Sequence, residues 1–275
     1  MADIAHLKKV VIFHLYYHEL WEKIKPYLLN LQEISPFDLF ITTPFENDDL
    51  FTKIKQSFSD SVNISIRITP NEGADLYPFF DVLDSIDLDN YDILYKIHTK
   101  RDVKQRRKIN GVNCGLHYWR ECMLNDILGK KNIRSRLQDF LDDETLGASG
   151  YFPYLISSPY VSNNNSVNTA YKIFDENLPL ISCYKHYGGT IFMARASLYK
   201  CLQHRFVVSD FVNTGTERFS DFTYLCEGLL GFCIAGQGYT YRKGNMFFYY
   251  LLKLVSHRIT YPLYKKFVNK FILGN

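Results

Sequence analysis

The sequence lacks the features that mark several common classes of protein. No apolar run approaches the roughly 18 residues needed for a membrane-spanning helix. The six cysteines form no CxxC pair and no His/Cys spacing typical of a metal site, so we interpret them as reduced thiols of a cytosolic protein. A net charge of +3 on 275 residues is too small to indicate a nucleic-acid-binding protein. What remains is a chain long enough for one large globular domain or two small ones.

Glycine-rich phosphate-binding motifs are absent as well. No GxGxxG follows the first apolar run, and no GxxxxGK[ST] occurs anywhere. Because such loops cradle the phosphates of dinucleotides and nucleoside triphosphates, their absence argues against a Rossmann dehydrogenase and a P-loop NTPase. The apolar stretch after Lys8 and Lys9 lacks a small-residue cleavage site, so it predicts a buried first strand rather than a signal peptide.

Strand and helix patterns alternate through the first hundred residues. Apolar, β-rich runs predict strands at 10–16, 37–43, 63–69 and 91–97, and helical spacing occurs at 19–31, at 48–57 and from about residue 76. This alternation predicts an α/β fold, with a mostly parallel sheet flanked by helices. In such sheets the ligand lies outside the carboxyl ends of the strands, so the loops at 42–47, 70–75 and 98–107 are candidates for the site.

One of these loops begins with a cluster of positive charge. Residues 95–102 read YKIHTKRD, an apolar strand that ends in His98, Lys100 and Arg101. Charge-assisted hydrogen bonds from such side chains can neutralise a diphosphate. A solvated loop is the alternative interpretation, and it is favoured for the remaining bases of the run, which are Lys104, Arg106, Arg107 and Lys108.

An acidic triplet, Asp87-Leu88-Asp89, has the spacing of a divalent-metal motif. It precedes the strand at 91–97, so we place it at the amino edge of the sheet, opposite the ligand crevice, and interpret it as a solvated turn. The sequence defines no cofactor. Mg²⁺ or Mn²⁺ held by Asp102 or Asp75 beside the bases is left open.

Three segments of the chain form a recognisable set, NEGADLYPFF at 71–80, YDILYKIHTKRD at 91–102 and GGTIFMARASL at 188–198. They resemble segments of the rhamnan synthesis protein F family of bacterial polysaccharide glycosyltransferases, and LCEGLLGF at 225–232 stands where that family has a glutamate-bearing helix. The resemblance implies a GT-A-like glycosyltransferase domain over 1–245, with a nucleotide-sugar-binding half at 1–145 and an acceptor half at 146–245. It also implies transfer of a sugar, with L-rhamnose from a dTDP-activated donor favoured, onto a lipid-linked surface polysaccharide such as capsule, O-antigen or rhamnan.

The resemblance and the residue types together define the predicted substrate-binding set. An amide, a glycine and a carboxylate after the third strand suit a base or a ribose, with a helix cap as the alternative role of Asp75. The glycine pair at 188–189 would admit a sugar or form a tight turn. The set is Asn71, Gly73, Asp75, Lys96, His98, Thr99, Lys100, Arg101, Arg120, Gly188, Gly189 and Thr190.

Inverting transfer requires a base for the acceptor hydroxyl, and a carboxylate is the usual group. The predicted catalytic residues are Glu227, Asp221 and His98, with Asp210 as a further candidate. Glu227 matches the family's glutamate, and a half-buried structural pair is its alternative role. Trp119, in a helix predicted at 118–129, is interpreted as a packing residue.

The last segment, 246–275, is aromatic and basic. Leu263, Phe267 and Phe271 share one helical face, and three lysines fall elsewhere. We predict either a peripheral helix on the inner face of the cytoplasmic membrane, which would suit a lipid-linked acceptor, or a terminal helix packed on the domain. The alternative function for the whole chain is a non-catalytic polysaccharide-assembly or nucleic-acid-binding protein, which would tolerate loss of both His98 and Glu227.

Overall fold

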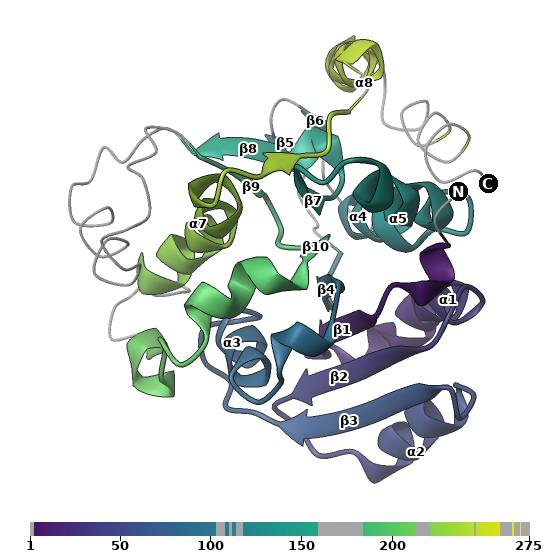
Figure 1. The fold of residues 1–275 in the computed structure, drawn as a ribbon, viewed down its shortest axis with the longest axis vertical. Coiled ribbons are helices and arrows are strands. Elements are labelled where there is room, and N and C mark those ends of the chain that lie inside the picture. The colour runs from purple at the N-terminus through teal and green to yellow at the C-terminus, as the bar shows by residue number, and fades with distance from the viewer. Residues whose placement is uncertain are drawn as a thin grey trace.

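A seven-stranded sheet forms the centre of the protein (Figure 1). The structure, a computed structural model, describes residues 3–102, 108–109, 112–113, 118–158, 184–212, 221–244 and 246–258, together with residues 266 and 270. The strands lie in the order β11-β7-β10-β4-β1-β2-β3. Most neighbouring strands are parallel, and helices flank the sheet, so the predicted α/β fold is confirmed.

The first half of the chain builds one side of this sheet. β1 (Lys9–His14), β2 (Phe37–Thr43), β3 (Val62–Ile68) and β4 (Ile93–His98) are parallel, as the alternating pattern predicted. They are connected through α1 (Trp21–Gln32), α2 (Asp48–Gln56) and α3 (Tyr77–Leu83), with the short 3-10 helices η2 (His18–Leu20) and η3 (Leu88–Asn90). A further 3-10 helix, η1 (Ile4–His6), precedes β1. β1 ends at His14, two residues before the predicted end.

The second half of the chain completes the same sheet. β7 (Leu146–Ser149), β10 (Phe192–Arg195) and β11 (Thr240–Tyr241) join it beyond β4, and β10 is antiparallel to both β4 and β7. The helices are α4 (Tyr118–Leu128), α5 (Ile133–Asp142), α7 (Asp221–Gly236) and α8 (Met246–Arg258), with η4 (Phe152–Tyr154), η5 (Ala196–Leu202) and η6 (Val208–Phe211). Two two-stranded antiparallel sheets of the described residues lie outside the main sheet, β5 (Lys108–Ile109) with β6 (Val112–Asn113) and β8 (Leu155–Ser158) with β9 (Tyr184–Tyr187).

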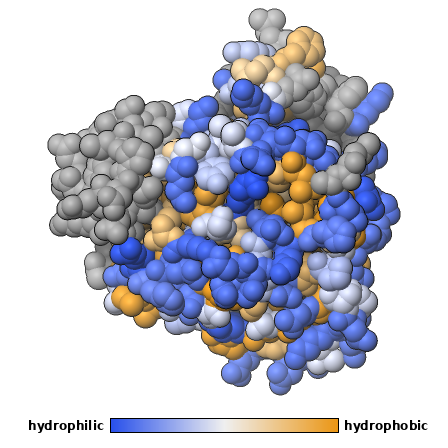
Figure 2. Space-filling model, in the orientation of Figure 1, coloured by the Kyte–Doolittle hydropathy of each residue, from blue (hydrophilic) through white to orange (hydrophobic). Residues whose placement is uncertain are grey.

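Alternate residues of β1 contribute to two hydrophobic cores, one on each face of the sheet. Val11 and Phe13 pack with residues of α1, α4 and α5, whereas Val10 and Ile12 pack with α3, η5 and α7. Side chains alternate between the faces of a strand, so a strand buried on both faces is a continuous apolar run. Figure 2 shows that the outer surface in this view is largely hydrophilic, with hydrophobic residues in small patches.

The acidic triplet lies at the amino end of β4, as predicted. Asp87 Oδ1 accepts a hydrogen bond from the Asp89 backbone N at 3.0 Å and so caps η3, and the Asp89 carboxylate pairs with Lys200. This turn is on the edge of the sheet opposite His98, so it makes no contribution to a site at the carboxyl edge.

None of the described helices is long and apolar enough to cross a membrane. Cys122, Cys201, Cys226 and Cys233 are free thiols. Cys114 and Cys183 lie outside the described residues, as do Lys104, Arg106 and Arg107 of the basic run.

Candidate functional site

Polar side chains replace apolar ones where β1 and β4 reach the carboxyl edge of the sheet. On one face, Val10 and Ile12 are followed by His14, and in β4 Leu94 is followed by Lys96 and His98. His14 and His98 are register partners at the last positions of the two strands. Both are buried, with 6% and 3% of their surface exposed. The core of this face therefore ends in a buried layer of ionisable groups.

Asp75 is the central acceptor of this layer. Lys96 Nζ donates a hydrogen bond to Asp75 Oδ2, Thr190 Oγ1 donates to the same oxygen at 2.6 Å, and His98 Nδ1 lies 3.4 Å from Oδ1. Burial opposes ionisation of Asp75, but the charge of His98 when its ring is protonated, together with the ammonium groups of Lys96 and Lys100, holds its pKa well below its usual range. The carboxylate is therefore ionised and compensated inside the protein.

The alternative role of Asp75 as a helix cap is wrong. α3 begins at Tyr77, its N-cap residue is Leu76, and no side chain caps its first turn. The Asp75 carboxylate instead points toward the end of β4 and the turn at 188–190. There Lys96 Nζ and Thr190 Oγ1 both donate hydrogen bonds to its Oδ2 atom. Pro78 occupies an early position in the helix, where its missing N–H costs nothing.

His98 uses both ring nitrogens within the protein. Its Nε2 lies 2.8 Å from the carbonyl oxygen of Gly189 and 3.2 Å from Thr190 Oγ1, while Nδ1 faces Asp75. Burial lowers the pKa of His98 well below its ordinary value despite the attraction of Asp75, so the ring is neutral. A neutral ring supplies no charge to a diphosphate. Its position indicates that His98 holds the Gly188–Thr190 turn against the end of β4.

Strained backbone lies on both sides of this network. Gly73 and Ala74 have φ angles of +62° and +55°, and Gly189 and Thr190 have φ angles of +93° and +53°. Non-glycine residues rarely adopt this region, at a cost of about 1–2 kcal/mol each, and such strain concentrates at functional sites. A Cβ at Gly73 would lie 2.5 Å from the Phe211 ring, so no larger residue fits there.

A buried arginine holds the loop that follows β4. Arg120 of α4, 1% exposed, donates from Nη1 to the Lys100 carbonyl oxygen and to Asp102 Oδ1, the latter at 3.0 Å. Lys100 Nζ lies 4.6 Å from the ring centroid of Trp119, which also packs against the core. The Arg120 guanidinium thus faces the loop backbone, where it positions Lys100 rather than reaching outward.

Other residues of the predicted set lie around this network. The Thr99 hydroxyl accepts hydrogen bonds from the backbone N of Tyr16 at 3.0 Å and of Tyr17 at 2.9 Å, which ties the loop after β1 to the loop after β4. Arg101 has a largely exposed side chain that lies 4.3 Å from the Tyr17 ring centroid. Asn71 is exposed. The glycine pair forms a tight turn, in which the Thr190 N donates to the Tyr187 O at 2.9 Å.

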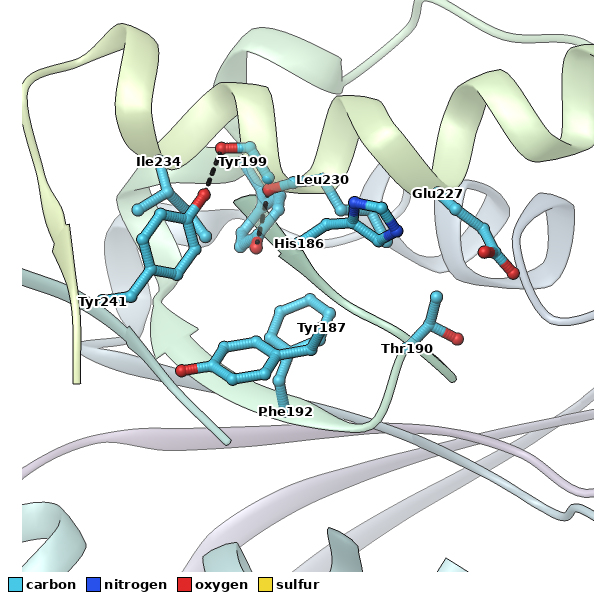
Figure 3. Close-up of a pocket in the computed structure, with 10 residues that line it drawn as sticks. His186, Tyr187, Thr190, Phe192, Tyr199, Glu227, Leu230, Ile234 and Tyr241 are labelled. Atoms are coloured by element: carbon cyan, nitrogen blue, oxygen red, sulfur yellow. Dashed lines mark hydrogen bonds between the residues drawn. The ribbon is translucent and has the colours of Figure 1, made fainter. Parts of the chain in front are cut away.

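Glu227 faces the network from α7. Figure 3 shows Glu227 at one end of a small pocket that His186, Tyr187, Thr190, Phe192 and Tyr241 also line. Burial raises the pKa of Glu227, and the charge of Asp75 raises it further, while Lys100 and Lys96 oppose the effect. A carboxylate with a raised pKa is a stronger base than an ordinary glutamate.

The other two predicted carboxylates differ from Glu227. Asp210 is exposed, and its Oδ2 accepts a hydrogen bond from the Val207 backbone N at 2.8 Å, which is a local capping role at η6. Asp221 is the first residue of α7, and its side chain lies outside the described structure.

His14 is the residue of this layer that sequence reasoning missed. Its Nδ1 lies 3.0 Å from Thr42 Oγ1, and burial lowers its pKa to about 4. The signal was present, because a histidine ends the first strand just as His98 ends the fourth. Two parallel neighbouring strands that end in the same residue type place those residues side by side.

The buried neutral His14 predicts a loss of stability in acid. Its pKa is lower folded than unfolded, so the unfolded chain binds the proton more readily, and stability falls as pH drops from about 6.5 toward 4. We expect His14→Gln to reduce this loss by about 3 kcal/mol, measured by urea unfolding across that range. His6→Gln, the same change at an exposed position, is the control. Parallel pH profiles for wild type and His14→Gln would contradict the prediction.

The described residues do not fit a divalent metal ion. Within the described ranges no group of three His, Cys, Asp or Glu side chains is placed to bind one. Asp75 shares its carboxylate with the Lys96 ammonium, and Asp102 with the Arg120 guanidinium, so the two candidate ligands already have cationic partners. We therefore derive no step through Mg²⁺ or Mn²⁺.

A mostly parallel sheet with one antiparallel inner strand, and a polar cluster at its carboxyl edge, define an α/β domain of the GT-A-like class. The family model described as Rhamnan synthesis protein F matches residues 2–172, and the chain belongs to this family. No curated protein matches the chain. Membership associates the chain with rhamnan synthesis. Asp75, Lys96, His98 and Arg120 lie within the matched residues, whereas Thr190 and Glu227 lie beyond them.

Proposed function

We propose that this chain is a glycosyltransferase that moves a sugar from a nucleotide-activated donor to a lipid-linked surface polysaccharide. The observation that carries the proposal is the buried network of Asp75, Lys96, His98 and Thr190 at the carboxyl edge, faced by Glu227. Ligands of open α/β sheets lie outside this edge. Ionised groups are rarely buried unless they serve a function or stabilise the structure. Family membership supports a function for this network.

Departure of a nucleotide diphosphate requires positive charge that reaches the leaving group. Lys96 is 1% exposed and compensated by Asp75, so its role is to hold the network together. Lys100, half-buried over Trp119, and Arg101, largely exposed and 3.6 Å from a Glu19 carboxylate oxygen, belong to the same loop at this edge. We assign donor diphosphate binding to these two side chains, with Arg120 as the residue that positions their loop.

Glu227 suits the base that takes the acceptor proton. Its pKa is raised by burial, yet Lys100 and Lys96 favour the ionised form that a base requires. Asp75 is unsuited to act as a nucleophile, because Lys96 and Thr190 occupy its oxygen Oδ2. Glu227, acting as a base for the acceptor hydroxyl, supports a single, inverting displacement.

Membership in the Rhamnan synthesis protein F family supports our choice of donor and acceptor. dTDP-L-rhamnose is the favoured donor, and the acceptor is a lipid-linked glycan of a capsule, O-antigen or rhamnan. A lipid-linked acceptor would place the reaction at the inner face of the cytoplasmic membrane.

A panel of nucleotide sugars tests this proposal. We expect dTDP-rhamnose to raise the melting temperature, because a ligand at about 100 times its Kd stabilises a protein by about 2.7 kcal/mol. Turnover should persist in excess EDTA, since the two candidate metal ligands, Asp75 and Asp102, already have cationic partners. A thermal shift with UDP-sugars alone would overturn the dTDP donor. Activity that is lost in EDTA and restored by Mn²⁺ would overturn the expectation that transfer needs no metal ion. The absence of both a thermal shift and turnover with every donor would overturn the proposal that the chain is a glycosyltransferase.

A further inference from the structure

The C-terminal part of the chain has a charge distribution unlike the rest. No aspartate or glutamate follows Glu227, whereas seven lysines and arginines lie between residues 242 and 275. The whole chain carries only +3, so the part before residue 242 is net acidic. Positive charge is therefore concentrated in one terminal segment, which begins shortly before α8.

α8 exposes apolar and aromatic side chains on one face. Met246 is 47% exposed, Phe247 78% and Tyr250 61%, and their spacing places them within one arc of the helix. The opposite side packs on the domain, where Leu252 is fully buried and the Tyr249 ring lies 5.7 Å from that of Phe152. Figure 1 shows α8 at the top of the molecule, and Figure 2 shows hydrophobic residues at the surface there.

The contacts of α8 tie it to the same edge of the sheet as the candidate site. Phe152 follows the carboxyl end of β7, and Gly244 packs so closely on it that a Cβ would lie 2.2 Å from the Phe152 ring. α8 also lies against β6, in the two-stranded sheet that follows the 98–102 loop of the site. Both anchors are segments that leave carboxyl ends of strands.

We infer that the exposed face of α8, formed by Met246, Phe247 and Tyr250, is an interfacial contact with a bilayer surface rich in anionic lipid. Aromatic side chains on a helix that lies in the membrane plane bury themselves at the boundary of headgroups and acyl chains. Each base near an anionic surface strengthens binding about fivefold. Among the described bases, Lys243 is exposed just before α8 and Lys253 lies within it, 4.7 Å from the Tyr249 ring centroid, whereas Arg242 is paired with Asp139 at 2.7 Å.

Charge complementarity favours lipid over a second copy of the chain. In a symmetric contact Lys243 and Lys253 of one copy would approach the same residues of the other, and like charges close together repel. An anionic bilayer carries the opposite charge and accepts the apolar side chains as well. The purpose of the contact rests on the proposed function, because it would present the site to a lipid-linked acceptor, but lipid binding itself requires no donor.

Vesicle sedimentation of the full chain tests this inference. We expect binding to vesicles of phosphatidylcholine with phosphatidylglycerol, and at least tenfold weaker binding to phosphatidylcholine alone or in about 0.5 M salt, where charges are screened. Phe247→Ser with Tyr250→Ser should weaken binding at least tenfold, and Lys243→Gln with Lys253→Gln should also weaken it. The matched control is Val207→Ser with Tyr224→Ser, which removes side chains that are 59% and 55% exposed elsewhere.

The outcomes separate this inference from the proposed function. Unchanged binding in the α8 double variant, an equal loss in the control, or equal binding to neutral vesicles would overturn it. Self-association that the α8 variant abolishes, without vesicle binding, would assign the face to a second copy instead. Melting temperatures of the variants establish that they fold. If no donor binds but the protein still binds vesicles, only the proposed glycosyltransferase function is overturned. If a donor is turned over but the protein does not bind vesicles, only the proposed membrane contact is overturned.

Discussion

Replacing Lys96 with methionine should destabilise the protein by about 3–5 kcal/mol, the cost of leaving a buried charge without its partner. The Lys96 and Asp75 side chains are 2% and 11% exposed, so water cannot take over the role of the missing ammonium. The carboxylate would then take up a proton, because Lys96 is one of the groups that keep its pKa low. Urea unfolding of the purified variant at neutral pH measures the effect.

The controls for Lys96→Met use the pair itself and a surface pair. The double variant with Asp75→Asn removes both charges, and we expect it to be more stable than the sum of the two single losses predicts. Lys130→Met breaks the exposed Lys130–Glu33 pair and should cost no more than about 1 kcal/mol. A loss in Lys96→Met no larger than that of Lys130→Met would show that the buried pair does not stabilise the network.

Replacing Glu227 with glutamine should lower turnover by about 10²–10⁴-fold, the usual contribution of a positioned general base. Glutamine keeps the shape of the side chain but cannot accept the proton. The pKa of Glu227 is raised, so its charge is disfavoured in the folded protein, and the variant should be as stable as wild type or more stable at neutral pH. Steady-state kinetics with the donor identified by the panel measure the loss.

The pH profile distinguishes a base from a structural carboxylate. Wild-type turnover should fall on acidification at a higher pH than the titration of an ordinary glutamate, because burial and Asp75 raise the pKa of Glu227. Asp210→Asn is the matched control, since Asp210 is exposed and caps η6, and it should leave turnover unchanged. Full activity in Glu227→Gln, or an equal loss in Asp210→Asn, would remove Glu227 from the catalytic role.

Much of the fold followed from local pattern. The four parallel strands and the helices between them could be predicted because each is a long segment with a clear period, and the carboxyl-edge rule then selected the loops that contain Asp75, His98 and Lys100. The encounter of Thr190 with Asp75 could not be predicted in this way. It depends on β10, which runs antiparallel beside β4 and brings the turn at 188–190 to that edge from a distant part of the sequence.

The sequence by itself determined the order of the strands along the chain, the edge at which a ligand would lie, and the residue types collected there. Only the tertiary structure decided what those residues do with one another. In the folded protein the pKa of His98 is lowered so that its ring is neutral, Arg120 donates a hydrogen bond to the Lys100 carbonyl oxygen, and Asp75 accepts one from Lys96. The physical reason is that the charge state and the available atoms of an ionisable side chain depend on desolvation and on its partners, and burial by segments far apart in sequence sets both.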